Sequence, residues 1–391
     1  MDGVTDIGST RWRILASAMV SFFAVGVTFF AVPPLIPALR DAFGLNNFQL
    51  GALMGAIAVP AIALSVPLGA AVDRWPPRRA GLAGLWVMLA GAAAFALAPG
   101  YWALFAGRLL FGIGALLINL LLARVLSAAF AGKELALAMS LFTGVYPASM
   151  IALFSLHPWL EATLGWRGEL ALLAALVAVA IPLHARVVPE TLEAKEAGSG
   201  SAAEGRAIPA GLVVLGVAWM LYFAAFAPVP TFAPEWAGGG SGGLLVASLV
   251  TWVALAATPV AGALIDRSGR PQAWCAVGMA LLAATLAAMG AGAVPPWAAM
   301  ALVGVVAAAV PPAVYALPAR LVGAARVGLA FGFITALSNL GTVLGPALAG
   351  GVRDATPAWP PVWTGLAAVA AAGAAAALFV RSEKRAVTPG P

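Results

Sequence analysis

Apolar residues gather into twelve long runs, separated by short polar segments. The runs span approximately residues 12–36, 48–72, 80–98, 102–126, 135–157, 168–187, 209–232, 243–265, 273–292, 297–319, 327–350 and 361–380. A hydrocarbon core about 30 Å thick is crossed by about 20 helical residues. No run has the two-residue alternation of a half-buried strand. The pattern therefore predicts an all-α integral membrane protein with twelve transmembrane helices.

The longest polar stretch lies between the sixth and seventh runs. It extends from Pro189 to Arg206 and contains several acidic residues followed by a Gly-Ser-Gly-Ser sequence. Such a composition is typical of a flexible linker. We therefore expect an N-terminal six-helix bundle over residues 1–187, a cytoplasmic linker over 188–208 and a C-terminal six-helix bundle over 209–391.

Composition supports a membrane protein and argues against other classes. The chain is 62% hydrophobic and 9% charged, whereas soluble domains are about a quarter charged. The formal charge of +6 does not indicate nucleic-acid binding, because basic residues occur in small groups between apolar runs. The single Cys275 excludes an intrachain disulfide. Residues 1–10 lack the basic region of a cleaved signal peptide.

The distribution of Lys and Arg predicts the orientation, because these residues stay on the cytoplasmic side of a membrane. With the N-terminus inside, seventeen of them fall in cytoplasmic segments, and three, Arg40, Arg167 and Arg353, fall in outer loops. We therefore expect both termini in the cytoplasm and a location in the bacterial cytoplasmic (inner) membrane.

The two halves of the chain repeat. Asp73 follows the second run and Asp266 follows the eighth, 193 residues later. Arg124 ends the fourth run and Arg320 ends the tenth, 196 residues later. Two halves of like orientation indicate pseudo-symmetric bundles with a transport site between them near the bilayer midplane.

The segment 69–79 resembles the loop signature of the major facilitator superfamily of secondary transporters. The matching residues are Gly69, Asp73, Arg74, Arg78 and Arg79, with Pro76-Pro77 in place of the single Gly of the pattern. Together with the twelve runs, the linker and the repeat, the resemblance covers the whole chain. It implies a transporter and not an enzyme, moving a small-molecule substrate across the lipid bilayer by alternating access without a cofactor.

Two further patterns occur inside the runs. Arg108, Gly112 and Gly114 are similar to the pattern in the fourth helix of many members. Gly341, Gly345 and Pro346 resemble an antiporter signature, which in the family lies in the fifth helix whereas here it lies in the eleventh run.

The charge clusters at the inner helix ends are expected to form a gate. The resemblance implies that Asp73 faces the start of run 11 across the two halves, where a carboxylate is favoured by about 0.3–2 kcal/mol. Such contacts exist only while the cytoplasmic side is closed. The predicted gating residues are Asp73, Arg74, Arg78, Arg124, Asp266, Arg267 and Arg320. The alternative is that these charges only orient membrane insertion.

In the family, helices 1, 4, 7 and 10 line the cavity, with contributions from their neighbours. The candidate substrate-binding residues are Arg108, Asn119, Tyr222, Trp252 and Tyr315. The aromatic members favour a partly apolar or planar solute. The alternative is that Trp and Tyr side chains serve as interfacial anchors.

Arg108 is the ionisable residue deepest inside a run, about 9 Å from its outer start at about 1.5 Å per residue. Its guanidinium stays charged, so insertion requires a compensating partner. The side chain could extend to the outer interface, bond to backbone carbonyls or Asn119, or hold a bound anion. One hypothesis is therefore that the substrate is an organic anion with Arg108 as its countercharge.

The titratable residues do not determine whether solute transport is coupled to protons. His157 and His184 lie at run ends without a Cys, Asp or Glu at ligand spacing, so we predict no metal site and interfacial imidazoles. Every Asp and Glu falls in a loop or at a helix end, with Asp41 and Glu235 nearest to a relay position. A uniporter or exchanger is therefore as consistent as a proton-coupled carrier. A drug or metabolite efflux antiporter and a lipid transporter of the same fold are alternatives. We expect a monomer.

Overall fold

The computed structural model describes residues 6–130, 134–191, 208–322 and 326–380. In these ranges the regular structure is helical throughout. The first half forms α1 (Asp6–Phe29), α2 (Val32–Phe43), α3 (Asn47–Ala56), α4 (Val59–Arg74), α5 (Pro77–Ala96), α6 (Tyr101–Ala129) and α7 (Leu135–Val187). The second half forms α8 (Ala210–Phe226), α9 (Pro228–Trp236), α10 (Gly240–Ser268), α11 (Pro271–Gly290), α12 (Pro296–Tyr315), α13 (Pro318–Leu321), α14 (Val327–Ala355) and α15 (Pro360–Leu378). The all-α prediction is confirmed.

The described ranges contain eleven helical segments long and apolar enough to span a membrane, and one of them is double. That segment, Leu137–Val187, has 51 residues, and a straight helix of that length would be more than twice as long as a bilayer core is thick. Gly165 breaks it with φ 66° and ψ 168°, a conformation that favours glycine. The two arms correspond to runs 5 and 6, so the helices agree with twelve crossings.

Four of the predicted runs are broken into two helices. Runs 1, 2, 7 and 10 become α1–α2, α3–α4, α8–α9 and α12–α13. Each second helix has a proline in its first two positions. Proline lacks an N–H and cannot continue a helical hydrogen-bond ladder, although it fits a first turn. The breaks leave backbone carbonyls without helical partners, and this matters for Arg108 below.

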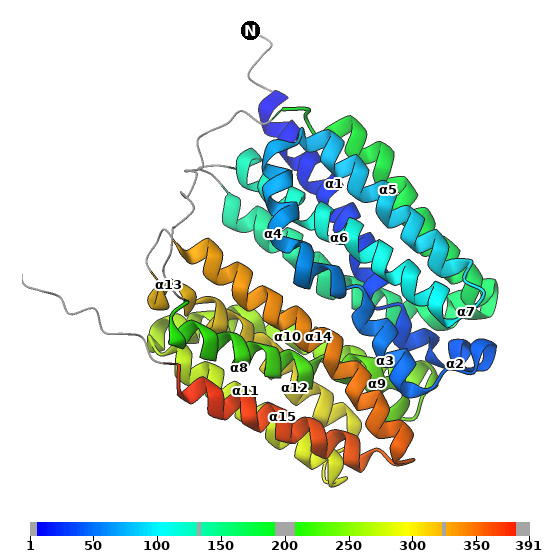
Figure 1. Cartoon of the computed structure of the whole chain (residues 1–391), viewed down its shortest axis with the longest axis vertical. Helices are drawn as coiled ribbons and strands as arrows, with labels where there is room; N and C mark the ends of the chain where they lie inside the picture. The colour runs from blue at the N-terminus through cyan, green and yellow to red at the C-terminus, as the bar shows by residue number, and fades with distance from the viewer. Residues whose placement is uncertain (1–5, 131–133, 192–207, 323–325, 381–391) are drawn as a thin grey trace, which may run out of the picture.

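Figure 1 shows α1–α7 in one bundle and α8–α15 in a second. The bundles converge where α2, α3 and α9 lie and diverge toward α4 and α13. We call the converging end the outer end, because it contains the loops predicted to lie outside, and the opposite end the inner end. Most of the predicted linker, residues 192–207, lies outside the described residues.

The buried apolar core joins the bundles at the outer end. One continuous cluster contains Leu35 and Leu50 of the first bundle together with Leu215 and Trp363 of the second. The inner part of the first bundle forms a separate core around Leu122. The two halves therefore share a packed interior at one end of the molecule.

Glycines allow α3 and α14 to pack closely across the two halves. A Cβ on Gly51 would lie 2.0 Å from the Pro346 carbonyl oxygen, and one on Gly350 would lie 2.0 Å from that of Asn47. On α14, Gly341 and Gly345 meet the backbone of α8 in the same way. The glycine pattern of run 11 is thus accounted for by close helix packing.

Candidate functional site

Arg108 is buried at the centre of the first bundle, with no exposed surface. Its guanidinium lies 5.4 Å from the centroid of the Phe95 ring. It donates four hydrogen bonds to backbone carbonyls: Nε to Leu53 at 2.9 Å, Nη1 to Thr28 at 2.6 Å, and Nη2 to Phe29 at 3.1 Å and Met54 at 3.3 Å.

These carbonyls belong to the two helix breaks. The Phe29 carbonyl lacks its usual donor, because the residue four positions later is Pro33. The Met54 carbonyl loses its donor because the N–H of Ala58 bonds instead to Gly55, at 2.9 Å. The guanidinium supplies the missing donors at both breaks. The geometry favours the structural alternative for Arg108, since four of its five N–H donors are occupied and no solvent reaches it.

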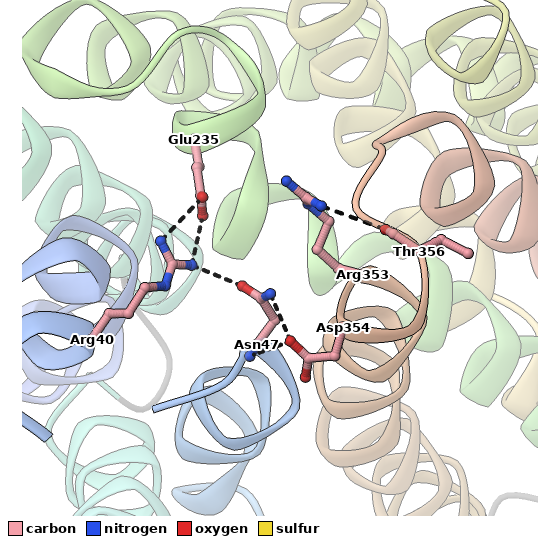
Figure 2. A network of polar contacts seen from close by, with 6 residues as sticks. All are labelled: Arg40, Asn47, Glu235, Arg353, Asp354 and Thr356. Carbon is pink, nitrogen blue, oxygen red and sulfur yellow. Dashed lines mark hydrogen bonds and ion pairs between the residues drawn. The ribbon is translucent and has the colours of Figure 1, made fainter. Parts of the chain in front are cut away.

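At the outer end, an ion pair joins the two halves (Figure 2). Arg40 of α2 contacts both carboxylate oxygens of Glu235 of α9, each at 3.2 Å, and its Nη2 also donates to Asn47 Oδ1 at 2.8 Å. The Arg40 and Glu235 side chains are 36% and 33% exposed. Planar bidentate pairing fixes orientation as well as distance. Sequence reasoning identified both residues but not the pair.

Asp354, near the outer end of α14, binds the N-terminus of α3 (Figure 2). Its Oδ1 accepts from Asn47 N at 2.9 Å and from Asn47 Nδ2 at 2.8 Å, and its Oδ2 accepts from Phe48 N at 2.8 Å. A carboxylate is favoured there by about 0.3–2 kcal/mol. This contact is the outer counterpart of the one predicted for Asp73, with the two halves exchanged, and the internal repeat was the signal that could have revealed it.

Each bundle has an aromatic cluster on helices that correspond to predicted cavity helices. In the first, Phe22 of α1 stacks on Phe142 of α7 at 4.4 Å. In the second, Tyr222 of α8 lies between Trp219 and Phe226 at 4.9 and 5.4 Å, with interplanar angles of 11° and 10°.

The remaining predicted substrate-binding residues differ in exposure. Tyr222 is buried, whereas Tyr315, which lies edge-on to Trp219 at 5.8 Å, is 49% exposed. Trp252 is 53% exposed and Asn119 is also exposed. Tyr222 and Tyr315 therefore belong to one cluster, and the structure does not bring Arg108 into it.

Three of the predicted inner gate residues contact groups of their own half of the chain. Arg78 lies 3.7 Å from Glu190, and Arg320 donates to the Gly269 carbonyl at 3.0 Å. Arg124 donates to the Val72 carbonyl. Arg74, Asp266 and Arg267 are exposed. The side chain of Asp73 lies outside the described part, so its predicted contact with the start of run 11 stays a prediction.

Two predictions about titratable residues are wrong. His157 and His184 are not interfacial, because they are 3% and 0% exposed. His157 also has acidic neighbours, Glu161 at 3.2 Å and Glu169 at 2.8 Å. Glu169 lies at the start of the second arm of α7, as predicted, but its side chain is buried completely. The turn at Gly165 brings residues 157 and 169 together, and a sequence pattern does not reveal that juxtaposition.

Comparison with known proteins identifies the family. The family model for the major facilitator superfamily matches residues 18–238 and 211–391. The chain is 29% identical over 180 residues to a 2-nitroimidazole transporter of Escherichia coli, covering 44% of each protein. It is 24% identical over 278 residues to the lysosomal dipeptide transporter MFSD1 of Mus musculus, covering 65% of this chain and 60% of the relative. The chain thus aligns with less than two thirds of either relative.

Solved structures have the same fold. A point mutant of the nucleoside transporter NupG superimposes with a TM-score of 0.79 at 14% identity, covering 95% of this chain and 99% of that one. A POT family transporter superimposes with a TM-score of 0.76 at 12% identity, covering 93% and 95%. The charge signature, the repeated halves, the helix arrangement and the family model agree, and the chain belongs to the major facilitator superfamily of transporters.

Proposed function

We propose that this protein moves a small organic solute across the membrane by alternating access, and that the conformation described here is closed on the outer side. The observation that supports this most directly is the polar network of Figure 2, in which Arg40–Glu235 and Asn47–Asp354 join the two halves at the outer end.

The strength of this network is suited to a gate. Exposed ion pairs contribute about 0–1 kcal/mol, and a carboxylate at a helix N-terminus contributes about 0.3–2 kcal/mol. Opening would replace these contacts with water contacts, at a cost of a few kcal/mol at most. A solute with about a hundredfold preference for one conformation offsets about 2.7 kcal/mol. The network can therefore bias the equilibrium between conformations without preventing either one.

The aromatic clusters support a solute with a planar ring. The clusters lie on α1, α7, α8 and α12, which correspond to helices around the cavity in this family. An offset or edge-on ring pair contributes about 0.5–1.5 kcal/mol beyond area burial. The relatives named for transport of 2-nitroimidazole, nucleosides and dipeptides point to small organic solutes. Exposed Asn119 and Tyr315 would supply hydrogen bonds to such a solute.

The substrate class can be tested with purified protein in liposomes. We expect a 2-nitroimidazole, a nucleoside or an aromatic dipeptide to raise the melting temperature, because a ligand of the folded state stabilises it by mass action. The stabilising compound should also be taken up. Scrambling of labelled lipid without uptake of any compound would favour the lipid-transporter alternative.

The gate can be tested with single cysteines and a membrane-impermeant maleimide. Cys275 is buried, so background labelling should be low. Ile36, 2% exposed at the outer interface, and exposed Asn119 are suitable reporter positions for the two sides. We expect Arg40→Ala to raise labelling of Ile36→Cys and lower that of Asn119→Cys.

Arg353→Ala is the matched control, since Arg353 contacts Thr356 and Trp359 within one half. Equal labelling of Ile36→Cys with and without Arg40 would contradict the outer gate.

A further inference from the structure

His157, Glu161 and Glu169 form a cluster of titratable side chains near the turn of α7 at Gly165. His157 Nδ1 lies 2.8 Å from Glu169 Oε2, and Nε2 lies 3.2 Å from Glu161 Oε2. The Glu169 side chain is 0% exposed, whereas that of Glu161 is 45% exposed. In a straight helix residues 157 and 169 would be about 18 Å apart. The turn at Gly165 brings them together.

Burying the carboxylate of Glu169 costs free energy, because a charged group loses its contacts with water. Its Oε1 has no hydrogen-bond partner in the described part of the chain, and its Oε2 pairs with His157. A buried carboxyl group with so few partners is stable only as a paired anion or in its protonated form. Either solution requires a proton within the cluster.

The number of protons follows from the contacts. A carboxylate only accepts hydrogen bonds, and a neutral imidazole has a single N–H. His157 Nδ1 is hydrogen-bonded to Glu169, whereas Nε2 faces Glu161 at 3.2 Å. If a neutral imidazole donates to Glu169, the second contact joins two acceptors, and one added proton makes it attractive as well. The proton resides on the imidazole or on one carboxyl group, and its loss breaks one contact.

The cluster borders a pocket between the two halves. The pocket is lined by Pro33 and Pro37 of α2, His157 and Glu161 of α7, Glu235 of α9 and Ser241 of α10. Because Glu161 is partly exposed, the cluster is connected to solvent at the outer end. Glu235 is also the partner of Arg40 in the outer gate.

Other charges near the cluster are few. Helices α1, α5 and α10, which pack on α7, have their charged residues at the inner end. Arg108 of α6 bonds to carbonyls, and Arg167 of α7 donates to Ala96 and Ala98. From α2, Arg40 is paired and Asp41 is exposed. Glu235 is therefore the acidic group that shares the pocket with the cluster.

We propose that His157, Glu161 and Glu169 form a proton-binding site, reached from the outer side, whose protonation favours closure of the Arg40–Glu235 gate. The proposal rests on the alternating-access function proposed above. The step is a proton transfer from outer water to a ring nitrogen or carboxylate oxygen, and no other bond changes. Loss of the proton adds one negative charge to the pocket shared with Glu235, which opposes closure. A proton that binds outside and favours closure is what a solute–proton symporter requires.

The first test measures maleimide labelling of Ile36→Cys in liposomes between about pH 5 and pH 8. Because maleimide reacts with the thiolate, labelling is expressed at each pH relative to that of the same variant after unfolding. We expect this ratio to increase about tenfold over the range, within the usual span of coupling between sites. His157→Gln and Glu169→Gln should abolish the pH dependence of the ratio. His184→Gln is the matched control, because His184 is also buried but packs against Gly81 away from the cluster.

The second test does not depend on the gate. The chain has two histidines, so isotope-labelled histidine gives two assignable sets of ring nitrogen signals. We expect the His157 nitrogen signals to change with pH, and to change differently in Glu169→Gln. A His157 signal unchanged by pH, or a pH response unaffected by Glu169→Gln, would overturn the proton site.

The two proposals fail in different ways. If Arg40→Ala leaves Ile36→Cys labelling unchanged, the gate is wrong, whereas the nitrogen signals still decide the proton site. If Arg40→Ala opens the outer side but Glu169→Gln retains the full pH dependence, the gate stands and the proton site is overturned.

Discussion

Replacing Arg108 with lysine is expected to damage folding more than solute binding. The guanidinium donates to four carbonyls at two helix breaks, and a hydrogen bond to a charged group contributes about 1.5–3 kcal/mol. A lysine ammonium is a single point charge with three donors. If it keeps two of the four bonds, the loss is about 3–6 kcal/mol. That is a large part of the stability of about 5–15 kcal/mol typical of native proteins.

The assay is a melting curve of the detergent-purified protein, together with binding of the solute identified by the ligand screen. We expect the Arg108→Lys midpoint to fall by about 5 °C or more, while the affinity of the remaining folded protein is retained. Arg167→Lys is the control, because Arg167 is exposed and contacts two carbonyls at 3.1 and 3.3 Å. If Arg108→Lys melts at the wild-type temperature but binds the solute more weakly, the structural role is refuted and the countercharge hypothesis is favoured.

Three further changes test the outer contact and the aromatic cluster. Gly51→Ala should open the outer side in the cysteine assay, because its Cβ would lie 2.0 Å from a backbone oxygen of α14, whereas Gly144→Ala, with nothing within 4 Å, should not. Asp354→Asn removes the charge at the N-terminus of α3, and we expect outer labelling to rise about two- to fivefold, equivalent to about 0.4–1 kcal/mol; unchanged labelling would contradict this contribution. Tyr315→Ala should weaken binding of a planar solute about tenfold, as measured by titration calorimetry, since a ring contact contributes about 0.5–1.5 kcal/mol in addition to area burial.

The crossings, the repeat and the family can be recognised from the sequence alone. The bilayer demands about 20 apolar residues per crossing, and Lys and Arg remain on one side, so both signals can be read locally along the chain. Arg108 can also be recognised locally, because a charged side chain inside an apolar run needs compensating partners. The partners of Arg108 depend on the helix breaks after Phe29 and Ala56. The positions of the prolines indicate these breaks only in part.

Which helix faces meet becomes clear only in the folded structure. Lipid and protein interior are similarly apolar, so the sequence of a transmembrane helix does not distinguish its buried face from its lipid face. Arg40 and Glu235 are 195 residues apart in the chain and become a pair only because the bundles converge at the outer end. His157 and Glu169 likewise meet only because the left-handed turn at Gly165 reverses the chain between them. The contacts on which the gate and the proton site depend are set by packing between helices, which local sequence patterns do not encode.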